Sequence, residues 1–241
     1  MKPILLIPFL LFTLLLAKTP KGEVIAQIPE ASGITYRKQT DTLIVANDEG
    51  SYYTLSTKGK ILSKKRLGKY DLEGVVSDEN TLIFAIEDRG LLVVDKKTDK
   101  KSVLMIDTSY KEKYITLFNK KSGIEGIAKV GDRLYLAKQS KKRKDSFIAV
   151  VQLGTSPLAI VDVIEHHIKD TAGLTYHKGY LYMVSDKEDL LLKYDLDKKK
   201  IVQKVHLMKG AWEGIAFDAK NVYLADDNGR IVKYSKKALG L

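Results

Sequence analysis

Three glutamates of this sequence occupy the same local position, directly before a glycine and a short apolar run. They are Glu73 in LEGVV, Glu125 in IEGIA and Glu213 in WEGIA. If the fold brings the three carboxylates together, they repel one another and need protons, basic partners or a bound cation. Calcium suits such a set because it takes oxygen ligands from carboxylates, carbonyl groups and water together. The alternative is that each glutamate accepts backbone hydrogen bonds within its own unit, far from the other two.

Other polar residues recur around the same glycines. The residue before glycine is Ser32 in one further unit and Ala172 in another. One set of acids lies three residues before glycine, and a second follows the next apolar run: Glu30, Asp71 and Asp170, then Asp48, Glu87, Asp186 and Asp227. Most members of the second set are expected to serve turns, where Asp accepts backbone hydrogen bonds. If the protein also binds a ligand, the expected polar lining is Glu30, Ser32, Asp71, Asp170, Asp186 and Asp227.

The repeated glycines define the elements that must position these side chains. The spacings between Gly33, Gly74, Gly126, Gly173 and Gly214 are 41, 52, 47 and 41 residues. Short runs rich in β-branched and aromatic residues follow each glycine, with turns of Gly, Asn, Asp and Lys between them. A unit of about forty residues with four strands is typical of a β-propeller blade, whose first strand lines the central channel. The residues before the glycines are therefore expected near the axis.

The two ends of the chain complete one blade. The fifth unit stops after its third strand, at Ser235, whereas GEVIAQI at residues 22–28 precedes the first glycine motif as IVQKVHL precedes the fifth. We predict one all-β domain over residues 18–241, a five-bladed β-propeller with four-stranded antiparallel blades, whose last blade is closed by the N-terminal strand. An open sandwich would explain neither the repeat nor the complementary ends.

Two segments lengthen the repeat. Residues 107–123 suit either a flap over one face or a surface loop with no role. Residues 138–146 predict an extended hairpin tip with four adjacent cations, Lys141, Lys142, Arg143 and Lys144. Such a tip can contact a headgroup or a phosphate, although a solvated tip is the simpler interpretation.

The N-terminal segment indicates export. Residues 1–17 combine Lys2 with a mostly apolar run, as in a secretory signal peptide. Leu15 is a poor residue for a cleavage site after Ala17, so an uncleaved anchor is the alternative. The expected location is the periplasm, or the outer face of the inner membrane if the signal is retained. The chain has no cysteine, which excludes disulfides and a lipid-modified cysteine.

The charge of the chain bears on its partners. The formal net charge is +11, which favours weak contact with an anionic membrane surface. Export and the scattering of the lysines through turns argue against nucleic acid as a partner. We expect a monomer that binds a small-molecule or protein ligand.

The order of the five motifs resembles the SdiA-regulated (YjiK-like) family of exported bacterial proteins. EASG and DTAG in units one and four, with LEG, IEG and WEG in the others, carry the resemblance, which extends from about Glu23 to Tyr234. It implies a five-bladed propeller, distantly similar to NHL-repeat propellers, with a calcium site and no established reaction. Ala172 departs from the serine of EASG, so blade four has no hydroxyl group at this position.

The sequence gives little support for an enzyme. There is no G-x-S-x-G elbow, no H-E-x-x-H motif and no Gly-rich phosphate loop. His166 and His167 are expected at an edge or surface and His177 in a turn, so no catalytic residue is assigned. We expect a calcium-binding scaffold in the cell envelope. The alternative, a calcium-dependent hydrolase of esters, lactones or phosphoesters at the channel, rests on fold analogy.

Overall fold

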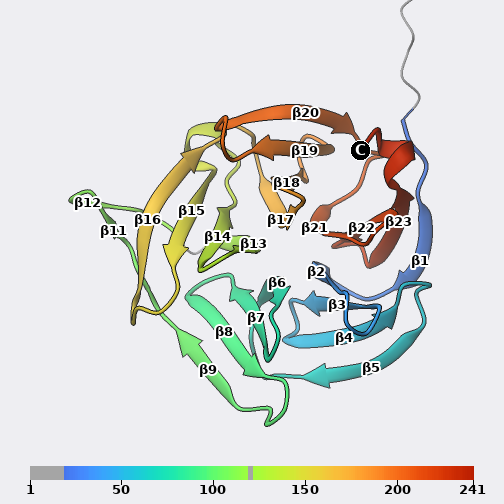
Figure 1. Cartoon of the computed structure of the whole chain (residues 1–241), viewed down its shortest axis with the longest axis horizontal. Helices are drawn as coiled ribbons and strands as arrows, with labels where there is room; N and C mark the ends of the chain where they lie inside the picture. The colour runs from blue at the N-terminus through green and yellow to red at the C-terminus, as the bar shows by residue number, and fades with distance from the viewer. Residues whose placement is uncertain (1–18, 119–121) are drawn as a thin grey trace, which may run out of the picture.

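The computed structural model describes residues 19–118 and 122–241. Five sheets, each with four antiparallel strands, stand in a ring around a central axis, with their first strands innermost (Figure 1). The third sheet has one additional short strand, which pairs parallel at its outer edge. This arrangement confirms the predicted all-β, five-bladed propeller. The described residues contain no α-helix, only the short 3-10 segments η1 (Arg143–Asp145) and η2 (Lys236–Leu239).

The four strands of each blade follow one another from the channel outward. Blade one is β2 (Ala31–Arg37), β3 (Thr42–Asn47), β4 (Ser51–Ser56) and β5 (Ile61–Arg66); blade two is β6 (Leu72–Ser77), β7 (Thr81–Ile86), β8 (Gly90–Asp95) and β9 (Lys101–Leu104). Blade three is β13 (Ile124–Val130), β14 (Arg133–Lys138), β15 (Phe147–Gln152) and β16 (Leu158–Glu165). Blade four is β17 (Thr171–His177), β18 (Tyr180–Ser185), β19 (Leu190–Asp195) and β20 (Lys200–His206); blade five is β21 (Trp212–Phe217), β22 (Asn221–Asp226), β23 (Arg230–Ser235) and β1 (Glu23–Gln27).

The core lies between blades rather than inside any one of them. Five apolar clusters fill the five spaces between neighbouring sheets, and the cluster between blades four and five joins Leu191 to Trp212 and Val222. The second strands are covered on both faces, so they consist of nearly continuous apolar residues. The outer strands are largely exposed or half-buried.

The repeated glycines mark the places where the inner strands meet. A Cβ atom at Gly214 would lie 2.6 Å from the carbonyl oxygen of Ser32, and one at Gly173 would lie 2.6 Å from that of Glu213. The equivalent glycines of blades one, two and three meet the backbone of the next blade in the same way. A side chain at these positions would separate neighbouring blades, so the close approach requires glycine.

The ring closes as the sequence predicts. Strand β1 pairs antiparallel with β23, with Val24 opposite Val232 and Gln27 opposite Arg230. Just beyond β1, Ile28 is completely buried, and its N–H donates to the carbonyl of Gly229 at 2.7 Å. The first and last parts of the chain therefore share the hydrogen bonds and the core of blade five.

The insertion before blade three runs along the outside of the ring. Strand β10 (Ile106–Asp107) pairs parallel with β16, and β11 (Ser109–Tyr110) and β12 (Lys113–Tyr114) form a small hairpin beside that blade (Figure 1). Leu117 is completely buried in the cluster between blades two and three. The described part of the insertion thus extends the outer edge of blade three.

The basic tip is tied to the neighbouring blade by one of its residues. The guanidinium group of Arg143 pairs with the Glu188 carboxylate at 2.7 Å and donates to the carbonyl of His167 at 3.0 Å.

The expectation that His166 lies at an edge or surface is wrong: it is 6% exposed, and its Nδ1 accepts a hydrogen bond from the N–H of Ile168. Burial lowers the pKa of His166 to about 4, so it is neutral at physiological pH.

The predicted signal peptide, residues 1–17, lies outside the described residues. No helix in the described ranges is long and apolar enough to cross a membrane.

Candidate functional site

Every inner strand is irregular at the repeated motif. The pairing of the first strand with the second shifts register between Leu72 and Val75 in blade two and between Trp212 and Gly214 in blade five. The other three blades have comparable shifts. A bulge redirects side chains out of the regular alternation of a strand. The residue before each glycine lies inside this irregular segment in all five blades.

The three glutamates are withdrawn from water and interact with one another. Glu73 and Glu125 are each 5% exposed, and Glu213 is half-buried. Burial is the main cause that raises the pKa of Glu125 to about 8 and that of Glu213 to about 10, and it also raises the pKa of Glu73. The charge of Glu125 adds to the shifts of the other two. These carboxyl groups therefore favour protonation at neutral pH unless a positive charge lies near them.

The tightest carboxylate group combines Glu73 with two aspartates. Asp48, Asp71 and Glu73 each offer an oxygen, and these oxygens lie within 4.8 Å of one another. Burial raises the pKa of Asp48 to about 7, an effect that a hydrogen bond from the Ser32 hydroxyl opposes. Oε2 of Glu73 is buried and has no hydrogen-bond partner among the described residues.

The dimensions of the group fit calcium. Calcium–oxygen distances of about 2.3–2.6 Å allow two ligand oxygens to lie up to about 5.2 Å apart. The 4.8 Å limit lies within that span. Glu125 interacts with Glu73 through charge and a side-chain hydrogen bond, and Glu213 interacts with it through charge, but both are outside this group. A cation shared by Glu73, Glu125 and Glu213 stays a prediction.

The two further sets of acids lie side by side at the same end of the channel. In each blade, the N–H after the second strand donates to the carbonyl three residues before the glycine. Asp48 donates to Glu30 at 3.3 Å, and Asp186 donates to Asp170 at 3.2 Å. This backbone pairing gives both sets a role in turns, and it holds their side chains around the channel entrance.

The predicted lining residues differ in burial and in their partners. Asp170 is 2% exposed, whereas Glu30 is exposed and Asp227 is half-buried. Lys187 pairs with Asp186 and lies 4.0 Å from Oδ2 of Asp170. Part of the negative charge on the side of blade four is therefore neutralised by a lysine.

Blade three contains a cation that sequence analysis missed. Lys138 ends β14 and is 2% exposed; its ammonium group donates to the Ser122 hydroxyl at 2.5 Å and to the carbonyl of Gln139 at 2.9 Å. Burial lowers its pKa, and the charges of Glu125 and Glu87 oppose that shift. The available signal was a lysine at the end of the apolar strand RLYLAK.

The participation of Asp48 in the carboxylate group was also missed. Its position after the second strand predicts a turn, as for most of that set, and it does form one. No local signal in the sequence pairs Asp48 with Asp71, because β4 and β5 separate Asp48 of blade one from the start of blade two.

Comparisons with known proteins agree with this architecture. No curated protein sequence matches the chain. The crystal structure of glutaminyl cyclase from Myxococcus xanthus is similar, with a TM-score of 0.64 and 12% identity over 88% of this chain and 94% of that chain. BamB from Moraxella catarrhalis gives a TM-score of 0.44 and 14% identity over 87% of this chain and 61% of that chain. At 12% identity the similarity to the cyclase shows the fold alone. The family model described as SdiA-regulated matches residues 17–228, and this chain therefore belongs to the SdiA-regulated family.

Proposed function

We propose that this protein is an exported propeller that binds calcium at the end of its channel and presents the surrounding loops to a small-molecule or protein ligand in the cell envelope. The observation that carries the proposal is the buried, unpartnered Oε2 of Glu73 beside Asp48 and Asp71. An ionised carboxylate in such a place is costly unless it is paired or coordinates a metal. A divalent cation among the three groups would remove both the repulsion and the missing contact.

Asp48, Asp71 and Glu73 are the proposed ligands. Glu125 and Glu213 interact electrostatically with Glu73, so the same ion would also stabilise their ionised carboxylates. Calcium is favoured because it accepts irregular sets of oxygens and completes its coordination with carbonyl groups and water. Magnesium demands near-octahedral geometry, which an open group of three carboxylates does not impose.

The test is a calcium titration of protein freed of metal by dialysis against chelator. Wild-type protein should bind one calcium ion and gain stability, by about 2.7 kcal/mol when free calcium is at a hundredfold excess over the dissociation constant. Glu73→Gln should remove most of this gain. Glu79→Gln is the matched control because Glu79 is exposed in a turn at the other end of blade two. Unchanged thermal unfolding of the wild type with calcium would show that these carboxylates hold no such ion.

A calcium-dependent hydrolase is the second candidate. A surface depression of about 480 Å³ is lined in part by Asp48 and Asp71, so a substrate could reach an ion bound there. Turnover of a panel of esters, lost with chelator and reduced in Glu125→Gln, would favour the enzyme. Binding without turnover would favour the scaffold.

Export is tested separately. Fractionation of cells should place the protein in the periplasm or on the inner membrane. The mass of the isolated protein then decides between cleavage after Ala17 and a retained anchor.

A further inference from the structure

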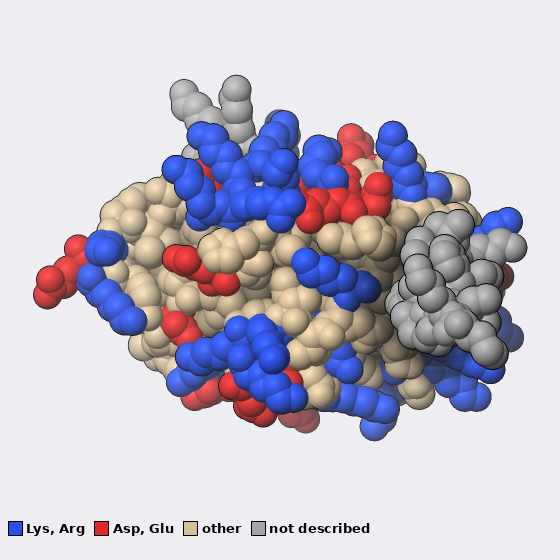
Figure 2. Space-filling view, turned by 90° about the horizontal axis from the view of Figure 1, so that it is seen from above, with Lys and Arg blue, Asp and Glu red and all other residues tan. Residues whose placement is uncertain are grey.

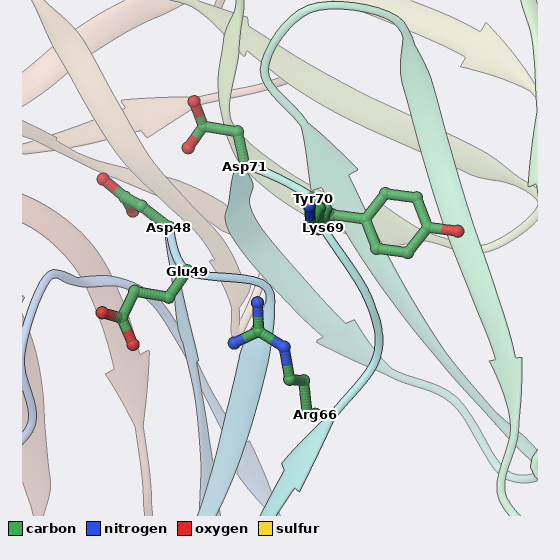
Figure 3. Close-up of a pocket in the computed structure, with 6 residues that line it drawn as sticks. All are labelled: Asp48, Glu49, Arg66, Lys69, Tyr70 and Asp71. Carbon is green, nitrogen blue, oxygen red and sulfur yellow. The ribbon is translucent and has the colours of Figure 1, made fainter.

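The depression beside the carboxylate group also contains cationic side chains. It has a volume of about 480 Å³ and is lined by Asp48, Glu49, Arg66, Lys69, Tyr70 and Asp71 (Figure 3). Arg66 ends β5, while Lys69 lies in the link that leads to β6. Two of the proposed calcium ligands thus share one wall of a depression with two cations.

Arg66 differs from most other arginines near this end of the molecule. Arg89, Arg143 and Arg230 each pair with a carboxylate. The side chain of Arg66 is exposed and, within the described ranges, forms neither an ion pair nor a hydrogen bond. In Figure 3 its guanidinium group extends toward the turn that contains Asp48 and Glu49, whereas the ring of Tyr70 points away from the aspartates. Its donors are therefore available to a ligand.

Because of the charges that line the depression, binding of an anion there depends on a bound cation. Three carboxyl groups and two cationic side chains line the depression, so an anion alone meets a net negative surface when all five groups are ionised. A divalent ion on Asp48 and Asp71 reverses the sign of that charge. A guanidinium group matches the two oxygens of a carboxylate or phosphate with paired donors.

We propose that the depression binds a small oxyanion, a carboxylate or a phosphate group, with one oxygen on the calcium ion and the others accepting hydrogen bonds from Arg66. The proposal rests on the calcium site proposed above and names the class of ligand for it. Lys69 adds positive charge at the rim. Glu49 weakens anion binding, because its exposed carboxylate competes with the anion for the guanidinium group of Arg66.

The experiment uses calorimetric titration of the calcium-loaded, full-length protein with three probes, each of which carries a single phenyl ring. Phenyl phosphate and benzoate carry the oxyanion, and benzamide is the uncharged counterpart of benzoate. At least one of the two anions should bind, benzamide should not, and removal of calcium should abolish the signal. The stronger of the two anions identifies the ligand as a phosphate or a carboxylate.

Variants separate this site from the calcium site. Arg66→Gln should weaken the anion about tenfold to a hundredfold, as expected for loss of a charge-assisted bond. Its calcium affinity should be at least that of the wild type, because Arg66 is not a ligand of the ion and the loss of its positive charge reduces repulsion. Arg66→Lys should restore only part of the anion binding, and Glu49→Gln should strengthen it.

Arg37→Gln is the matched control, because Arg37 lies at the opposite end of the same blade. Normal calcium binding with no anion binding, equal binding of benzamide, or full anion binding by Arg66→Gln would each overturn the oxyanion site. Failure of the calcium titration itself would instead overturn the proposed function.

Discussion

Glu213 carries a different charge in the folded and unfolded chain. Its pKa is raised to about 10 by burial first and by the charge of Glu125 second. An unfolded glutamate titrates near 4.3, so between that pH and 10 the folded state binds the extra proton. Stability is then greatest below the unfolded pKa and falls as pH rises toward the folded pKa. The effect belongs to the metal-free protein, because a bound cation favours the ionised carboxylate.

Glu213→Gln should flatten the pH dependence of stability in metal-free protein. The wild-type melting temperature should fall between pH 5 and pH 8, with at most about 1.4 kcal/mol of stability lost per pH unit from this group. The variant has no proton to lose, so its melting temperature should fall less. Thermal unfolding measured by circular dichroism checks this, with Glu79→Gln as the control. Equal slopes for Glu213→Gln and the wild type would show that Glu213 ionises in the folded protein as it does in the unfolded chain.

The residues of the site were predictable to different degrees. Glu73, Glu125 and Glu213 could be singled out because each precedes a repeated glycine, and a ring turns equal positions into neighbours. Asp48 could not be paired with Asp71 in this way, since they belong to different sets and different blades. Lys138 was hidden for another reason: the burial of a lysine depends on partners, such as Ser122, that lie elsewhere in the chain.

At the scale of the strand, the spacing of the repeated glycines was enough to predict the blades. The five motifs lie on five inner strands, and each motif glycine meets the backbone of the next inner strand. This requirement explains why a short phrase recurs while the rest of each blade varies. The outer insertion could not be predicted as an edge, because the parallel pairing of β10 with β16 depends on a distant strand and leaves no local period.

Gly214→Ala should destabilise the ring without a change of charge. The added Cβ would lie 2.6 Å from the carbonyl oxygen of Ser32, so blades five and one must move apart. Overpacking of this kind costs about 1–3 kcal/mol, which corresponds to a fall in melting temperature of several degrees. Gly131→Asn is a suitable control because Gly131 has open space around it and a φ of 60°, which asparagine tolerates. A melting temperature equal to that of the wild type would mean that the inner strands separate at little cost.

Removal of β1 should damage the whole propeller. A chain that begins at Glu30 lacks the pairing of Val24 with Val232 and the buried side chain of Ile28, and it leaves β23 as an open edge. Open edges pair with other chains, so lower stability and aggregation are expected. A chain that begins at Lys18 retains β1 and should be folded and monomeric by size-exclusion chromatography. If both chains melt at the same temperature, β1 does not contribute to closure.

At the scale of the whole molecule, charged residues are numerous but lie in separate groups. In Figure 2 the basic residues on the visible face form several separate groups, with acidic and uncharged residues between them. Charges divided in this way do not form one continuous basic surface on that face. We propose that these separate groups make only weak contact with an anionic membrane. Such contact should weaken with salt, because the Debye length is only about 8 Å at physiological ionic strength.

Variants of the tip at residues 141–144 test a role in membrane contact separately from a role in structural pairing. Replacing Lys141, Lys142 and Lys144 with serine should leave the melting temperature nearly unchanged, within the range of about 0.5 kcal/mol typical of surface changes. It should also leave binding to anionic vesicles at low salt little altered, because many other basic residues remain. Arg143→Ser is the contrasting variant: it loses the pairing with Glu188 and the hydrogen bond to His167, so a small loss of stability of up to about 1 kcal/mol is expected. If the triple lysine variant instead releases the protein from vesicles while Arg143→Ser does not, the tip is a membrane contact, and the propeller is oriented with its carboxylate channel end toward the lipid.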